Sequence, residues 1–560
     1  MKFIKYASMA AAVAMLASCS SDNLGGGEPD PIEPGTGVAY LNIGLQLSNN
    51  PGGRGYGDDD LDGDFYDQGT AEEYAVEDGV VYVFVGTGDD DARYVAKGLL
   101  DKKTLSLNQD TKQLSTEPMK FKNITINDFD VNGDASYYAL VILNPDATIT
   151  VPAIGESFLE WSKKPVAGSM IGNNKQICMS NATKIVNGAA STLVKINATD
   201  ISKTEFDESQ EATTNIYVQR NVAKVTVVKA ANGYNSSFEE DGFSATAGDP
   251  TWALQVIQKT TYPVMNYANI DWTKNYMHSG WTTYSRAFWA VDPNYDNTEY
   301  SKDDFPFDTI ASTAAVDAAV GTSVYCLENT MNYNALTQDR TTGVIIKATW
   351  TPSKDDYNFE DGFFYINRKI WDTAHLLAAV KNAAQTILNT ENVEVTMANG
   401  LDGGTYSFDD VITSIKSGEE TADTEVTEAQ KEQIAASSLS LPDTQSERIA
   451  FYSDNEMYYA VRIRHFTDTE LYGETKNPFW PEGTTEYNYA ETDLGRYGVV
   501  RNNSYTITIA GIAGLGTPGI PELTTDPDDP GEDELSSNLR ANINILSWAK
   551  RSQSETLGGN

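Results

Sequence analysis

Near its end the chain reads Leu539-Arg540-Ala541-Asn542-Ile543-Asn544-Ile545-Leu546-Ser547-Trp548. Apolar and polar residues alternate along this stretch, which predicts a strand with one buried face. The apolar positions are Leu539, Ala541, Ile543 and Ile545. Residues 524–538 before it are mostly Asp, Pro, Gly, Glu and Ser, a composition typical of a flexible tether. A core strand on such a tether is expected either to complete the sheet of a neighbouring subunit or to fold back onto its own.

The composition predicts a folded, mostly β protein. Of the 560 residues, 40% are hydrophobic and 10% are aromatic, and the length is sufficient for about two to four domains. Thirty tyrosines favour strands. The 80 acidic residues outnumber the 40 basic ones, so nucleic acids and anionic lipids would be repelled and are excluded as partners. This balance suits a surface-exposed extracellular protein.

The amino-terminal segment, residues 1–18, is predicted to be a signal peptide. It has a positive start and an apolar stretch, Ala7–Leu16, that is too short to span a bilayer. It ends in Leu16-Ala17-Ser18-Cys19, which resembles a bacterial lipobox, so Cys19 is the expected lipidation site. The alternative is an ordinary signal peptide with a chance cysteine. Cys178 and Cys326 are too few for a disulfide framework and are expected to be buried.

A second amphipathic strand is predicted near the amino terminus, at Tyr40–Leu47, with four aliphatic residues on one face. The Asn-, Pro- and Gly-rich segment that follows contains Arg54, the only basic residue between Lys5 and Arg93. Exposed segments of this kind are preferred sites of proteolysis. A protease that cuts after arginine would remove the anchor and the strand together, so residues 19–54 are a candidate propeptide. The alternative is an incidental loop arginine.

The remaining chain is predicted to fold as two β domains, residues 55–214 and 215–523, followed by the tail at 524–560. The boundary is placed at the polar, acidic segment 205–214, which has no apolar period. Two short helical inserts are predicted, one at Trp371–Leu388 from its helical spacing and one near Glu428–Ala436.

No catalytic or metal centre emerges from the sequence, and no cofactor is expected. The three histidines are scattered without a motif; they are His278, His375 and His465. Asp128–Asp134 reproduces half of a calcium loop, but Ala139 stands where the bidentate glutamate belongs, so a polar hairpin is favoured. Asp60–Asp64 is a weaker case of the same pattern. No nucleophile frame or glycine-rich phosphate loop is present, which argues against an enzyme.

A cluster of tryptophans leaves a sugar-binding surface open as a possibility, although core and loop packing is favoured. The cluster comprises Trp252, Trp272, Trp281 and Trp289.

Several stretches, taken in order, resemble landmarks of Bacteroidales fimbrillins. Besides the lipobox and the strand before Arg54, they are Val80–Val85, Tyr137–Pro145, Val218–Val225 and Tyr325–Asn329. Val499–Tyr505 and the last strand, ending at Trp548, are similar to the stalk subunit of a minor fimbrium.

The resemblance implies two transthyretin-like β-sandwich domains and export as a lipoprotein to the outer membrane. It further implies cleavage after Arg54 by an Arg-specific protease and polymerisation into an adhesive type V pilus by strand exchange. The donor strand would be residues 539–548, with Leu539, Ala541, Ile543, Ile545 and Trp548 as its anchors. The implied partners are other copies of the chain, tip and anchor subunits, and a receptor on a host or bacterial surface. The main alternative is a glycan-binding surface lipoprotein that keeps its anchor.

Overall fold

The computed structural model describes most of the chain from Val38 onward. The described residues are 38–41, 43–47, 69–101, 105–107, 113–116, 119–122, 136–172, 176–186, 189–202, 205–206, 212–232, 234–240, 242–267, 270, 289–297, 306–310, 312–466, 489–512, 514–523, 539–546 and 551–552. All of them belong to one compact unit, Pro34–Asn560.

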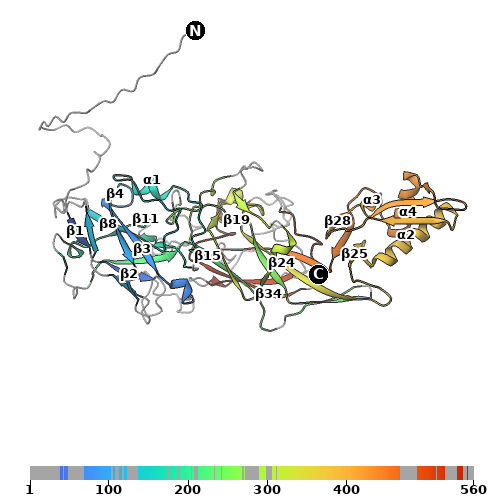
Figure 1. The fold of residues 1–560 in the computed structure, drawn as a ribbon, viewed down its shortest axis with the longest axis horizontal. Helices are drawn as coiled ribbons and strands as arrows, with labels where there is room; N and C mark the ends of the chain where they lie inside the picture. Colours follow the sequence, from blue (N-terminus) through green and yellow to red (C-terminus); the bar gives the residue numbers. More distant parts are fainter. Residues whose placement is uncertain are drawn as a thin grey trace, which may run out of the picture. The chain divides into compact units, whose positions relative to one another are not determined.

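The described part is mostly β-sheet with four α-helices, which confirms the prediction of an all-β protein with short helical inserts (Figure 1). The helices are α1 (Phe158–Ser162), α2 (Thr373–Leu388), α3 (Phe408–Val411) and α4 (Glu428–Leu439). Both predicted helices are therefore present, as α2 and α4. None of the helices in the described residues is long and apolar enough to cross a membrane.

Two sheets enclose the amino-terminal core. The larger has the order β4-β3-β8-β9-β14-β2-β6-β5, with β12 also on β8, and the smaller has the order β13-β1-β7. Their strands are β1 (Val38–Leu41), β2 (Gly44–Leu47), β3 (Asp78–Gly86), β4 (Arg93–Asp101), β5 (Leu105–Leu107), β6 (Gln113–Thr116), β7 (Met119–Lys122), β8 (Ser136–Leu143), β9 (Met179–Asn181), β12 (Val194–Lys195), β13 (Ile201–Ser202) and β14 (Asn215–Arg220). Alternate residues of β3 and β8 contribute to separate apolar clusters on the two faces of the larger sheet.

Two further sheets enclose a second core. One has the order β22-β15-β34-β35-β36, and the other has the order β16-β17-β24-β18-β21, with β32 also on β24. Their strands are β15 (Ala223–Lys229), β16 (Ser237–Glu240), β17 (Phe243–Ala247), β18 (Thr251–Gln255), β21 (Ala318–Ala319), β22 (Ser323–Cys326), β24 (Gly343–Ser353), β32 (Glu456–Arg462), β34 (Ser504–Ile512), β35 (Leu539–Leu546) and β36 (Arg551–Ser552). Short two-stranded pairs surround these sheets: β10 (Lys184–Val186) with β11 (Ala189–Ser191), β19 (Ile257–Gln258) with β20 (Phe307–Asp308), and β23 (Asn329–Thr330) with β33 (Gly498–Val499).

A third core lies within residues 362–453, which we call the inserted subdomain. It has two sheets, β26-β25-β31-β28 and β27-β29-β30, and all of α2, α3 and α4. Its strands are β25 (Gly362–Ile366), β26 (Lys369–Trp371), β27 (Val393–Met397), β28 (Gly404–Tyr406), β29 (Ile412–Ser417), β30 (Thr424–Glu425) and β31 (Ile449–Ser453). Its apolar cluster is distinct from that of the surrounding strands, so residues 215–523 hold more than the single β-sandwich expected.

The chain passes from the first pair of sheets to the second at Asn221 and Val222. β14 pairs with β2 and β9, whereas β15 pairs with β22 and β34. The sequence-based boundary at residue 214 therefore precedes the change of sheet by one strand.

Candidate functional site

The amino-terminal strand is divided between two sheets. The sequence predicts one strand at Tyr40–Leu47, but the structure has β1 and β2, separated by residues 42 and 43. β1 pairs with β13 and β7, both antiparallel. β2 pairs in parallel with β14 and antiparallel with β6. Both strands are thus interior strands, each with a neighbour on either side.

Three aliphatic side chains of this segment are fully buried. Leu41, Ile43 and Leu45 are exposed by only 1%, 1% and 0% and belong to the amino-terminal core. The three come from different strands and the link between them, but all contribute to the same core between the two sheets. Removing β1 and β2 would therefore open one gap in each sheet, and both gaps would expose apolar core.

Gly44 permits the close approach of β2 to β14. A Cβ atom at this position would lie 2.7 Å from Oδ1 of Asn215, its partner in the parallel register. The Gly44 N–H donates to the carbonyl of Thr214 at 2.8 Å, just before that pairing begins. A larger residue at position 44 would force the Asn215 side chain to move, so glycine is preferred at this position.

The predicted tail strand lies on its own subunit. β35 pairs antiparallel with β34, with Ile543 opposite Ile507 and Ile545 opposite Tyr505, and β36 adds to its other edge. This is the second of the two arrangements expected for the tail. Tyr505 and Ile507 are fully buried, so β34 belongs to the core of the second pair of sheets.

Several residues singled out from the sequence lie outside the described residues. They are Cys19, Arg54, Asp60–Asp64, Asp128–Asp134, Trp272, His278, Trp281 and Trp548.

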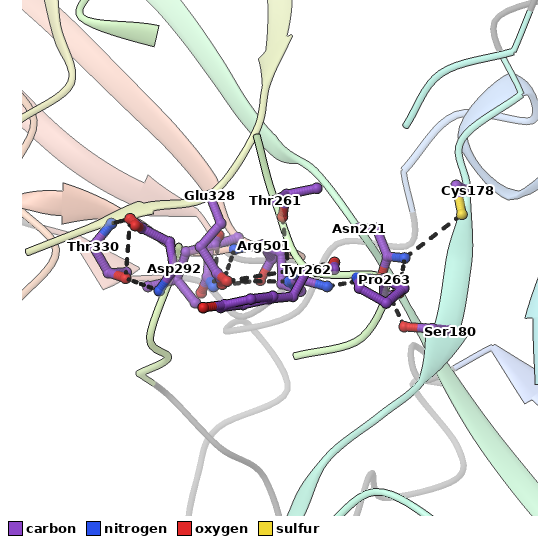
Figure 2. A network of polar contacts seen from close by, with 12 residues as sticks. Cys178, Ser180, Asn221, Thr261, Tyr262, Pro263, Asp292, Glu328, Thr330 and Arg501 are labelled. Carbon is purple, nitrogen blue, oxygen red and sulfur yellow. Dashed lines mark hydrogen bonds and ion pairs between the residues drawn. The ribbon is translucent and has the colours of Figure 1, made fainter. Parts of the chain in front are cut away.

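The strands that neighbour the two terminal segments are joined by a buried polar network (Figure 2). Arg501 lies just before β34, and its Nη2 is 3.2 Å from Oε1 of Glu328. Arg501 Nη1 donates to Oδ1 of Asn221 at 3.3 Å, and Asn221 follows β14 directly. The Ser180 hydroxyl of β9 donates to the same Asn221 oxygen at 2.8 Å. Neighbours of the amino-terminal segment and of the tail therefore meet through Asn221.

Backbone contacts tighten the same junction. The Arg220 N–H donates to Oδ1 of Asn502 at 3.2 Å, and the Asn502 N–H donates to the carbonyl of Val222 at 2.7 Å. The Lys224 N–H donates to the carbonyl of Asn503 at 2.9 Å. Asn502 has a positive φ of 59°, which asparagine tolerates better than most residues.

Asp292 forms the far end of the network, where it is 2% exposed. Burial raises the pKa of Asp292 to about 7, although the N–H groups of Thr330 and Asn294 both donate to its carboxylate. The pattern of residues in the sequence does not reveal this network. Its only signal was that three of the fimbrillin-like landmarks contain Asn221, Glu328 and Arg501.

The described histidines and tryptophans that were considered for catalysis or ligand binding are packed within the fold. His465 is buried and its Nδ1 lies 2.7 Å from the Tyr505 hydroxyl, while His375 contacts Asp372 at the start of α2. Trp252 and Trp289 are both 0% exposed, so neither offers a face for stacking on a sugar. Over the described residues, no three His, Cys, Asp or Glu side chains lie together as a metal site would need.

The two described cysteines are buried, as expected from the sequence. Burial raises the pKa of each thiol, Cys178 and Cys326, to about 12, so neither is a reactive thiolate near neutral pH.

Residues 450–554 match the family described as "Major fimbrial subunit protein type IV, Fimbrillin, C-terminal". The match includes β32, β34 and β35. No curated protein sequence matches the chain.

Solved structures give further likenesses at low identity. A fimbrilin from Porphyromonas gingivalis W83 is 14% identical, with a TM-score of 0.36 over 93% of this chain and 99% of that one. A candidate cell adhesion protein from Parabacteroides distasonis is 13% identical, with a TM-score of 0.37 over 91% and 100% of the two chains. A tip fimbrial protein from Porphyromonas gingivalis is 11% identical, with a TM-score of 0.27 over 85% and 95%. These scores are too low to establish a shared activity.

Proposed function

We propose that this chain, whose residues 450–554 match the fimbrillin C-terminal family, is a non-enzymatic structural subunit of a surface fimbrium that serves in adhesion. In this proposal the chain is exported as a lipoprotein anchored at Cys19 and is cleaved after Arg54. The cleaved subunits polymerise when residues 539–548 of one subunit replace the excised strand of the next. Its partners are other copies of the chain and the tip and anchor subunits of the same fimbrium.

The interior position of β1 and β2 is the observation that carries the proposal. A strand with neighbours on both sides cannot leave without exposing two rows of unpaired backbone groups and the apolar core beneath. Leu41, Ile43 and Leu45 mark that core. An incoming strand would restore both the main-chain hydrogen bonds and the filled side-chain positions, which is the donor-strand mode of recognition.

The energy available from refilling the gap is large enough to hold a polymer together. Three buried aliphatic side chains at about 1.5–3 kcal/mol each give about 5–9 kcal/mol before the cost of ordering the donor. The uncut chain already has its own strand in this place. Proteolysis after Arg54 then acts as the switch that permits polymerisation.

The pairing of β35 with β34 of its own chain is what we expect of an uncut subunit. With its own β1 and β2 in place, the chain offers no open gap to a neighbour, and the tail covers β34. After cleavage the tail leaves β34 and enters the gap of the next subunit. Such a head-to-tail contact does not close on itself, so it extends into a filament.

The test is to treat the purified precursor with an Arg-specific protease and to look for denaturant-resistant ladders on a gel. The intact chain is expected to form ladders and to begin at Gly55 on amino-terminal sequencing. The Arg54→Ala variant is expected to stay monomeric, and so is the cleaved chain that lacks residues 539–560. Ladders from the truncated chain would refute the assignment of the donor strand. A mature chain that still begins at Cys19 would instead favour an anchored surface lipoprotein.

A further inference from the structure

The inserted subdomain carries a cleft that the proposed assembly does not use. The cleft has a volume of about 560 Å³ and lies among β25, β27, β31 and α2, in the orange part of Figure 1. Phe364 and Phe451 form its buried floor, and half-buried apolar side chains extend it. These are Leu377, Val395, Met397 and Leu401. The lining of the cleft is mixed, with polar and apolar surface of similar extent. Cavities of this size that combine an apolar floor with polar groups occur as ligand sites.

Two aspartates that are neighbours through their backbones line the cleft. Asp361 and Asp454 both line it, and the Asp454 N–H donates to the Asp361 carbonyl at 3.4 Å. Asp454 and Asn455, with φ of 53° and 58°, form the tight turn between β31 and β32. Gly362 has a φ of 115°, and a Cβ atom there would lie 2.2 Å from the Tyr452 carbonyl oxygen. The backbone thus fixes this acidic corner.

The acidic corner has unbalanced negative charge. Asp361 and Asp454 are exposed, and neither forms an ion pair with another described residue. The positive end of α2, which also borders the cleft at Thr373, is already occupied. There Asp372 Oδ1 accepts from the His375 N–H and its Oδ2 accepts from the Asn358 N–H, both at 2.7 Å. Charge complementarity therefore favours a cationic group in the cleft over an anion.

One wall of the cleft is formed by β27, which is an edge strand among the described residues. β27 is the outer strand in the order β27-β29-β30. The Gly418 N–H donates to the carbonyl of Asn392, so these two residues form a hydrogen-bonded pair. Hydrogen-bonded and non-bonded pairs alternate in an antiparallel ladder, which leaves the peptide groups of Val395 facing away from β29. An extended chain could pair there as an added strand.

We propose that this cleft binds an extended peptide segment in which a lysine or arginine lies between aliphatic residues. Its main chain adds to the open edge of β27, the mode called β-augmentation. Its aliphatic side chains cover Leu377, Val395 and Met397, and its cationic side chain pairs with Asp361 and Asp454. This binding is independent of polymerisation and requires neither the excised strand nor the tail.

The test titrates the full chain with a labelled blocked peptide, acetyl-Leu-Val-Lys-Val-Leu-amide, and follows fluorescence anisotropy. The double variant Asp361→Asn, Asp454→Asn is expected to bind this peptide about tenfold more weakly, because the charge-assisted contacts are lost. The matched control is Glu419→Gln, Glu420→Gln, which removes two exposed charges from the turn between β29 and β30. This control is expected to bind within about twofold of the unmodified chain, since only general attraction to an acidic protein is changed.

Two further peptides separate strand addition from other contacts. A glutamate replacement of the lysine and an N-methyl replacement of the first valine are both expected to abolish measurable binding. Unchanged unfolding midpoints in both double variants exclude a folding defect. The proposal is overturned if the unmodified chain does not bind, if both double variants weaken binding equally, or if either altered peptide binds as well as the original.

Discussion

At the scale of single residues, the junction of the two pairs of sheets depends on charge buried away from water. Arg501 and Glu328 are exposed by 1% and 0%. Arg501 also donates to Thr261 and to the carbonyl of Tyr262 at 3.0 and 3.2 Å, so most of its guanidinium donors have partners. Such a pair adds little net stability over an apolar pair, but losing one partner leaves the other charged and buried.

Replacing Arg501 by methionine is expected to lower the free energy of unfolding of the uncut chain by about 3–5 kcal/mol. The combined variant Arg501→Met, Glu328→Gln is expected to lose less, because no uncompensated charge remains. Urea denaturation of both proteins measures the difference. A combined variant less stable than the single one would show that the ion pair is not what matters at this junction.

Asp292 gives the network a pH dependence. The pKa of its carboxyl is raised from 3.8 to about 7 by burial, so the folded state holds a proton that the unfolded state has lost over that interval. The free energy of unfolding contributed by Asp292 is therefore fully present below pH 3.8 and declines as the pH rises towards about 7. Asp292→Asn is expected to remove this part of the slope. Parallel stability curves for the two proteins between those pH values would contradict it.

Residues of this network could not have been found from the sequence alone. A buried arginine and a surface arginine look alike in a sequence. Glu328 and Arg501 are far apart in the chain and are brought together by the pairing of β23 with β33 and of β15 with both β22 and β34. The burial of Leu41, Ile43 and Leu45 could be predicted, because alternation of apolar residues indicates a buried face. Arg54 was singled out as the only basic residue between Lys5 and Arg93, within an Asn-, Pro- and Gly-rich segment, and its cleavage remains a prediction.

At the scale of elements, the spacing of apolar residues predicted where strands and helices form. It did not predict which strands pair with each other. The spacing of apolar residues in Trp371–Leu388 predicted α2. The helix begins after the N-cap Asp372 and ends at Asn389, which has a left-handed backbone conformation. The strand predicted at 40–47 is divided, because the chain must cross between two sheets after Leu41. Likewise, the polar segment at 205–214 suggested a boundary, yet β14 after it still pairs with the first sheet.

The excised strand provides a prediction that separates precursor from polymer. Leu45→Ala is expected to destabilise the uncut chain by about 2–5 kcal/mol, because it leaves a cavity in the amino-terminal core. The same substitution is expected to leave the assembled polymer unchanged, since Leu45 has been removed from it. Denaturant unfolding of the precursor and of the polymer measures the two effects.

Leu143→Ala is the matched control, because Leu143 is 0% exposed in the same core but stays in the mature chain. It is expected to weaken precursor and polymer alike. If Leu45→Ala also weakened the polymer, the amino-terminal strand would still be part of the mature subunit.

At the scale of the whole molecule, β2 and the tail strand β35 are linked through two strands that follow each other directly in the chain, β14 and β15. β14 pairs with β2 and runs through Asn221 into β15, which pairs with β34, the strand that holds the tail. The two terminal strands and the helices α2 and α4 were predictable, because each carries its own pattern of apolar residues. The separate core of residues 362–453 was not, because a stretch of ordinary amphipathic elements does not reveal which core it joins.

The most direct test of strand exchange locks the tail onto its own subunit. Thr506 and Asn544 are directly opposite in the pairing of β34 with β35, so Thr506→Cys with Asn544→Cys places two thiols within reach of a disulfide. After cleavage, the oxidised double variant is expected to remain monomeric, and reduction is expected to restore the ladder. The single variant Asn544→Cys controls for the substitution itself. Polymers that form equally well with the disulfide closed would contradict the claim that the tail leaves its own subunit.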